Sequence, residues 1–226
     1  MNFPDGLFPE TWAYGAWLPY LLALGGSVWR APWRRLADSG QLNVWLGTIV
    51  VLTLMWSLKA GVKPGLDLHL LGVTAFTLMF GRQLAIVGLS IVLAAVTYNA
   101  SLRGIDSAQA FALNALVMIV LPVLLAHAIL RCVERCLPAN LFIYIFFAAF
   151  FGAALCAIAA GAFASLLLFL AGVYTLEFLL SEYLPFYVLL GFAEAWLNGA
   201  AITLMVVYYP QWVGSFDDRR YLWRKK

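Results

Sequence analysis

Long apolar segments, spaced along nearly the whole chain, are the feature that most limits how this sequence can fold. A helix needs about 20 apolar residues to cross the hydrocarbon core of a bilayer. Candidate spans of this kind cover residues 11–29, 42–58, 68–81, 84–99, 108–130, 139–180 and 184–209. Only 11% of the 226 residues are charged, whereas a soluble domain carries about 25%. We therefore expect an all-α, polytopic membrane helical bundle with about seven transmembrane spans.

Two of these segments are ambiguous in length. The third is short and is bounded by Gly65 and Gly81, so it is expected to enter only part of the membrane or to pack deep inside the bundle. The sixth, 139–180, is long enough for one tilted helix followed by a surface segment, or for two spans. Topology helps to decide between these alternatives.

The distribution of basic residues predicts the topology. Eleven of the fourteen lie in alternate connections and in the tail: Arg30, Arg34, Arg35, Arg82, Arg131, Arg135, Arg219, Arg220, Arg224, Lys225 and Lys226. The positive-inside rule places these residues in the cytoplasm and the N-terminus outside. The number of crossings is then odd, which favours seven, with 139–180 as one span and Glu177 and Glu182 at the outer interface. We expect a single transmembrane domain over 1–210 and a basic cytoplasmic tail over 211–226, which suits anionic lipid and not nucleic acid.

Small residues recur every four positions along the sixth span. They form two adjacent rows: Ala148, Gly152, Cys156, Ala160 and Ala164, and Ala149, Ala153, Ala157, Gly161 and Ser165. Such spacing lets helix backbones approach closely in lipid. The rows predict packing inside the protein's own bundle or, alternatively, a docking face for a partner subunit.

Five polar residues interrupt the apolar spans, namely His69, Asn114, His127, Glu194 and Asn198. Glu194 and Asn198 lie one helical turn apart, so both should face the bundle interior. We expect them to make structural hydrogen bonds to a neighbouring helix, to support a site or to line an ion path. The predicted topology places His69 near the outer face and His127 near the cytoplasmic face, so they should not bind one ion together.

The opening MNFPDG is able to chelate a metal ion. The Met1 amine and the deprotonated Asn2 amide nitrogen close a five-membered ring around a metal, and the Asn2 side-chain oxygen closes another. A square-planar ion such as Ni(II) or Cu(II) favours nitrogen donors, and His69 could supply a fourth ligand. Pro4 has no N–H, which limits amide chelation to the residues before it. The Pro-Asp-Gly sequence at 4–6 also favours a turn that folds the terminus back over the bundle.

These residues resemble a known family of transporters. The opening Met-Asn-Phe-Pro-Asp-Gly, LHLLGVTAFTLMFG around His69, LNALVMIVLP and GFAEAWLNGAAITL are similar to motifs of the substrate-capture membrane subunit of cobalt and nickel energy-coupling-factor transporters, the CbiM/NikM type. The family has histidine at its second position, whereas this chain has Asn2. The similarity covers most of the chain in order and hydropathy.

The resemblance implies capture of a divalent transition-metal ion, Co or Ni, as substrate at the outer face of a bacterial inner membrane. The donors of the opening peptide would also suit Cu. The metal set carried over is Met1, Asn2 and His69. Delivery would be driven by a partner T component and ATPase subunits, since the chain has no phosphate-binding loop. No nucleophile with a paired base is apparent, so we expect neither an enzyme nor an organic cofactor.

Two alternatives stay open because Asn2 replaces an imidazole donor. The first is a membrane scaffold or assembly partner that has the same fold and no transport site. The second is capture of an organic substrate, which an apolar cavity without His69 in its wall would favour.

Overall fold

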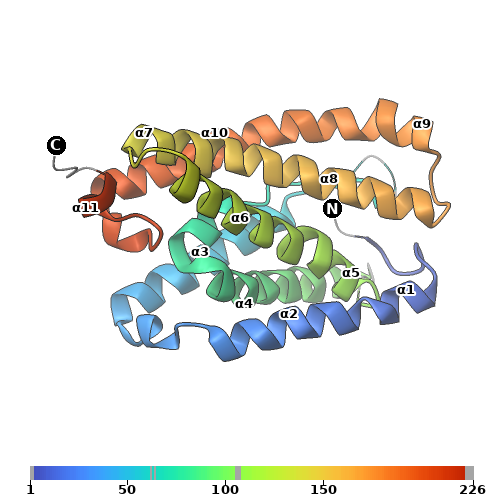
Figure 1. The fold of residues 1–226 in the computed structure, drawn as a ribbon. Helices are drawn as coiled ribbons and strands as arrows, with labels where there is room; N and C mark the ends of the chain where they lie inside the picture. Colours follow the sequence, from blue (N-terminus) through green and yellow to red (C-terminus); the bar gives the residue numbers. More distant parts are fainter. Residues whose placement is uncertain (1–2, 62, 64, 105–107, 222–226) are drawn as a thin grey trace.

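The structure is a computed structural model that describes residues 3–61, 63, 65–104 and 108–221. Long helices run side by side and make up most of it (Figure 1). Five helices in the described part are long and apolar enough to cross a membrane: Ser39–Ser57, Val73–Ser101, Phe111–Cys136, Leu141–Leu170 and Leu176–Tyr208. A multi-pass membrane helical bundle is therefore confirmed. The number of crossings and the sidedness of the termini stay predictions.

The first expected span is formed by two short helices. These are α1 (Glu10–Gly15) and α2 (Trp17–Arg30), which meet at Ala16. Helix α3 (Ser39–Ser57) begins where Asp38 accepts a hydrogen bond from the backbone N–H of Gly40, which satisfies one of the unpaired donors of a helix start.

Helix α4 (Val73–Ser101) lies at the centre of the bundle and contains the third and fourth expected spans. It is broken at Gly81, whose φ of 79° and ψ of 164° are not helical and favour glycine. The part before the break, which we call the inner helix (73–80), is almost entirely buried. The prediction that this short segment packs deep inside the bundle is confirmed. It starts later than expected because Asp67–Leu68 forms a strand.

Two later spans are continuous through prolines. In each, a π-helical turn precedes the proline. The first of these spans consists of α5 (Phe111–Ala115), the π-helical turn Leu116–Val120 and α6 (Leu121–Cys136). The second consists of α9 (Leu176–Phe178), the π-helical turn Leu179–Tyr183 and α10 (Leu184–Tyr208). The widened turn lets the helix accommodate a residue without an N–H. The last span therefore begins at Leu176 and not at 184, and the exposed Glu177 and Glu182 belong to its first turns.

The sixth expected span is one helix and not two. It consists of α7 (Leu141–Ile143), a π-helical turn at Tyr144–Phe150, and α8 (Phe151–Leu170). Both rows of small residues on it are buried, and α8 makes its most extensive contact with α10. Packing within the protein's own bundle is confirmed, and this face is not open to a partner.

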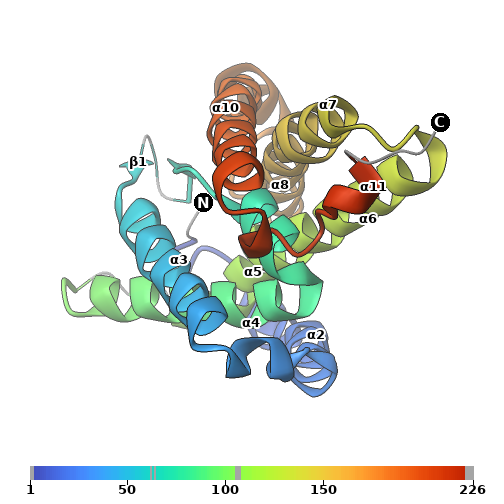
Figure 2. The same cartoon turned by 90° about the vertical axis from the view of Figure 1, so that its left-hand side faces the viewer.

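The N-terminal and C-terminal segments of the chain lie at opposite ends of the bundle. The N-terminal peptide lies at the end with α1, α5 and α9, whereas α11 (Asp218–Tyr221) lies at the opposite end (Figure 1). A hairpin formed by β1 (Ala60–Gly61) and β2 (Asp67–Leu68) belongs to the first of these ends. Figure 2 shows β1 just beyond the end of α3.

Candidate functional site

His69 lies in an irregular connection between α3 and α4, residues 58–72, which we call the strap. Strands β1 and β2 pair in antiparallel register, with Ala60 opposite Leu68 and Gly61 opposite Asp67. Residues 62 and 64 of the strap lie outside the described part of the chain. The hairpin brings His69 back over the bundle, one residue after β2 ends.

The imidazole of His69 is buried, with 5% of the residue exposed. Its ring centroid lies 5.4 Å from that of Trp56, and its Nδ1 lies 3.1 Å from the carbonyl oxygen of Leu70. If Nδ1 carries the proton, it donates to this carbonyl, and the lone pair is then on Nε2. A hydrogen bond to one ring nitrogen commonly fixes which nitrogen can bind a metal.

A cavity of about 600 Å³ adjoins His69. Met55, Ser57 and Lys59 line it together with the histidine. The Lys59 ammonium lies 3.9 Å from a carboxylate oxygen of Asp67. Burial lowers the pKa of Lys59, and the Asp67 charge partly offsets that effect. The cavity thus provides space beside the imidazole, with a thioether and a hydroxyl in its wall.

Glu194 and Asn198 of α10 hold the end of the strap. The backbone N–H of Leu71 and that of Gly72 both donate to the Glu194 carboxylate, the second at 3.1 Å. The Asn198 side chain donates to the same carboxylate at 2.7 Å and accepts from the N–H of Ala75 at 2.8 Å. Together they pair three backbone donors at and just before the start of α4, those of Leu71, Gly72 and Ala75. Both residues are buried, as the one-turn spacing predicted.

Two further side chains fix the strap against the bundle. The Trp56 indole N–H donates to the carbonyl of Leu71 at 2.9 Å. The Tyr187 hydroxyl lies 3.4 Å from the carbonyl of Asp67 and donates to it. Hydrogen bonds from α3 and α10 therefore reach the backbone on both sides of His69.

The N-terminal peptide is anchored in the bundle by Asn114. Phe3 is fully buried. Its N–H donates to Asn114 Oδ1 at 2.8 Å, and Asn114 Nδ2 donates back to the Phe3 carbonyl at 3.1 Å. Asp5 accepts from the N–H of Ala110 at 2.9 Å. The predicted turn is present, with Gly6 at a φ of 78°.

This anchored peptide packs on the strap. A Cβ added to Gly65 would lie 3.5 Å from Cδ1 of Phe3, so the Phe3 ring packs close to the strap backbone four residues before His69. The other two predicted metal ligands, Met1 and Asn2, lie outside the described residues. Because Phe3 gives its N–H to Asn114, its amide nitrogen is not available to a metal.

The second histidine belongs to a different region. His127 lines a cavity of about 390 Å³ with Arg35 and Arg131, and this cavity shares no lining residue with that of His69. In the part of the chain that the structure describes, no three His, Cys, Asp or Glu side chains gather as a metal cluster.

The role of Asn114 was not predicted from the sequence. Asn114 was recognised as a polar residue inside an apolar span, but its partner was not. A fully buried amide offers two donors and one acceptor oxygen that must be satisfied, and a peptide group matches them. The need of a buried Asn114 for hydrogen-bond partners was therefore the one signal of its role in the sequence.

The fold and the site define a polytopic membrane protein in which a buried N-terminal peptide and a histidine-bearing strap meet at one end. The family model described as "Cobalt uptake substrate-specific transmembrane region" (CbiM) matches residues 2–212. The chain therefore belongs to this family, which confirms the resemblance and makes the chain a transmembrane component of transition-metal uptake.

Two solved structures share the fold. One is a truncated transition metal transporter, with a TM-score of 0.76 and 15% identity, covering 92% of this chain and 99% of that chain. The other is a transition metal transporter, with a TM-score of 0.74 and 16% identity, covering 91% of this chain and 92% of that chain. A comparison with curated proteins found no match.

Proposed function

We propose that this protein captures a divalent transition-metal ion of the cobalt or nickel type as substrate, at the outer face of a bacterial inner membrane. The ligands are the Met1 amine, the Asn2 amide nitrogen and side chain, and His69. The ion then passes inward with the help of a partner membrane subunit and ATPases. Family membership and the two similar structures support the metal.

The observation that carries this proposal is the anchoring of the N-terminal peptide beside the strap. Phe3 is bonded to Asn114 and packs near Gly65, and Met1 is only two residues away. In this proposal, the anchored peptide directs the Met1 amine toward the buried imidazole. Preorganisation of this kind reduces the entropy lost on binding.

The donor set implies a defined pH dependence. An amine, an amide nitrogen and an imidazole must all be deprotonated to bind the ion. Binding therefore releases protons, and the affinity should rise with pH. Asn2 offers an oxygen where the family resemblance expects imidazole, and an oxygen is a harder donor.

Calorimetric titration of the purified protein with Ni(II), Co(II) and Cu(II) tests the proposal. We expect binding tighter than micromolar for one of these ions. His69→Ala should weaken it strongly, whereas the matched control His127→Ala should leave it unchanged. A short extension placed before Met1 should abolish binding, because it converts the terminal amine into an amide.

Two results would contradict the proposal. One is that no ion binds better than micromolar. The other is that His69→Ala and His127→Ala bind alike. Purification of a stable complex with an unrelated membrane enzyme, without any ATPase, would instead support the scaffold alternative.

A further inference from the structure

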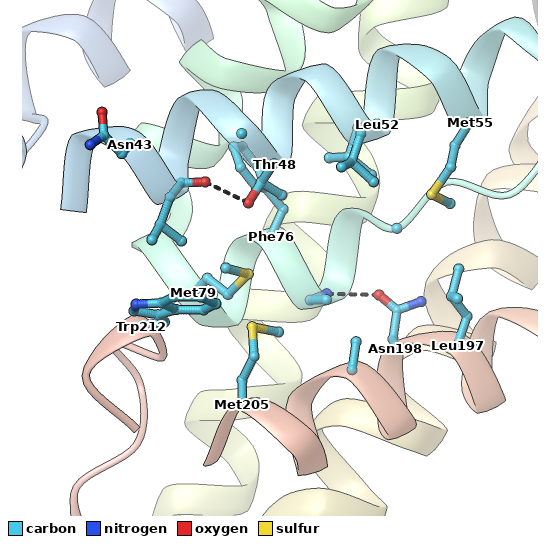
Figure 3. Close-up of a pocket in the computed structure, with 16 residues that line it drawn as sticks. Asn43, Thr48, Leu52, Met55, Phe76, Met79, Leu197, Asn198, Met205 and Trp212 are labelled. Carbon is cyan, nitrogen blue, oxygen red and sulfur yellow. Dashed lines mark hydrogen bonds between the residues drawn. The ribbon is translucent and has the colours of Figure 1, made fainter. Parts of the chain in front are cut away.

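A second cavity, distinct from that of His69, lies between α3 and α10. We call it the lateral groove (Figure 3). Its volume is about 510 Å³, which is within the range of about 300–1,000 Å³ typical of ligand sites. The inner helix forms its floor through Ala75, Phe76 and Met79, while Gly47 and Ala201 leave space on its two walls. His69 is not among its lining residues.

The groove offers almost no polar atoms to a ligand. Thr48 gives its hydroxyl to the carbonyl of Val44 at 2.7 Å, and the Asn198 oxygen accepts from Ala75 (Figure 3). Its rim is apolar and exposed, with Val51 at 54% and Leu197 at 40%. A water-soluble organic substrate needs several convergent polar contacts. The chemistry of this groove therefore suits hydrocarbon.

The space inside the groove is narrower than a whole helix. The lining residues of α3 run from Asn43 to Met55, which is about 18 Å along a helix axis. Spread over that length, 510 Å³ gives a mean cross-section of about 28 Å², whereas a helix about 10 Å wide needs about 80 Å². A single extended chain fits this width.

One end of the groove is rich in basic and aromatic groups. Trp212 closes it beside Asn43 (Figure 3), and the Arg35 guanidinium donates to the Trp212 carbonyl at 3.5 Å. Arg34, in the 3₁₀ turn Trp33–Ala37 that packs against α3, is exposed. Aromatic and basic side chains of this kind mark the level of lipid headgroups, and cationic ones attract anionic lipids.

We propose that the lateral groove binds one acyl chain of an anionic phospholipid, with the phosphate at the end that carries Trp212, Arg34 and Arg35. The apolar wall, the narrow width and the charge at one end together point to this ligand. The proposal does not depend on the metal site, because the groove and the His69 cavity share only Met55.

Matched substitutions on α10 test it. Ala201→Phe fills the groove, whereas Ala200→Phe places the same side chain on the exposed face one residue earlier. Gly47→Leu fills the groove from α3, where an added Cβ meets no atom within 4 Å. Each purified full-length variant is stripped of lipid, mixed with phosphatidylglycerol or phosphatidylethanolamine, and examined by native mass spectrometry. Thermal unfolding shows that each variant is folded.

We expect wild type and Ala200→Phe to retain one phosphatidylglycerol per chain, and Ala201→Phe and Gly47→Leu to lose it. Arg34→Gln should reduce the preference for phosphatidylglycerol over phosphatidylethanolamine. Equal retention by Ala200→Phe and Ala201→Phe would overturn the proposal, as would no retained lipid on wild type. A dimer that Ala201→Phe dissociates would overturn it in favour of a second copy of this chain.

Discussion

At the scale of single residues, Asn114 is the contact that holds the start of the chain. Both of its hydrogen bonds go to the peptide groups of Phe3, and both residues are fully buried. Removing a partner from a buried polar group costs more than the bond itself contributes, because the group left behind has lost its water. The proposed metal site therefore depends on a residue that does not need to touch the ion.

Asn114→Leu should be strongly destabilising. The substitution keeps a similar volume but leaves the N–H and carbonyl of Phe3 without partners, which should lower the free energy of unfolding by about 2–4 kcal/mol. Thermal unfolding in detergent measures the loss. Asn99→Leu, at a partly buried position near the end of α4, is the control, and equal losses would show that Asn114 has no special role.

Glu194 makes the corresponding contact for the strap. Glu194→Ala removes the acceptor for Leu71 and Gly72, so we expect a loss of about 2–4 kcal/mol together with weaker metal binding. Glu194→Gln keeps one acceptor oxygen and should recover part of both. If the alanine variant binds the ion as wild type does, Glu194 does not position the strap.

At the scale of elements, the contact between α8 and α10 depends on residues without side-chain bulk. A Cβ on Gly161 would collide with the ring of Tyr187, whose hydroxyl in turn reaches the strap. Tight helix packing in lipid relies on such small residues. The packing of α8 therefore also determines how the strap sits.

Gly161→Val should destabilise the bundle. The added methyl groups force Tyr187 to move, and overpacking of this kind costs about 1–3 kcal/mol. Ala162→Val adds two methyl groups one residue later, at an exposed position, and should change the midpoint of thermal unfolding little. Equal midpoints for the two variants would contradict this description of the interface.

The break in α4 provides a second test at this scale. Gly81 adopts a positive φ with no atom within 4 Å of an added Cβ, so Gly81→Ala should cost about 1–3 kcal/mol through backbone strain alone. Gly25→Ala, inside α2 and equally uncrowded, should be neutral or stabilising by about 0.5–1 kcal/mol. Denaturant titration of both variants makes the comparison, and a stabilising Gly81→Ala would refute it.

The elements were predictable where hydropathy decides them and less so where local geometry does. Apolar segments identified the long helices, and glycine spacing identified the buried inner helix. The short helical segments Trp33–Ala37, Pro210–Trp212 and Asp218–Tyr221 were not expected. The expected start of the last span at residue 184 was wrong, because the π-helical turn at Leu179–Tyr183 carries the helix through Pro185. The hairpin in the strap was missed because two-residue strands leave no alternating pattern.

At the scale of the whole molecule, the sidedness of the bundle can be tested with its own cysteines. Cys132 and Cys136 are exposed, with their sulfur atoms 4.0 Å apart, while Cys156 is buried. The charge distribution predicts that the exposed pair faces the cytoplasm. A membrane-impermeant maleimide should label inverted vesicles and not intact cells, and labelling of intact cells would reverse the topology.

The candidate site was predictable in part, because the topology of the whole molecule indicates which residues lie at the same end of the bundle. Hydropathy and charge place His69 and the chain start at one end, and the structure brings Phe3 and the strap together there. The anchors Asn114, Trp56 and Tyr187 join segments far apart in sequence. Their pairing depends on the tertiary packing, so no local pattern could identify the partners.

The central claim is that the terminal amine and His69 bind one metal ion. Electron spin echo modulation of the Cu(II)-loaded protein reports imidazole coordination directly, and the chain has only two histidines. We predict one coordinated imidazole in wild type and in His127→Ala, and none in His69→Ala. An imidazole signal that survives His69→Ala, or one that is absent from loaded wild type, would contradict the claim.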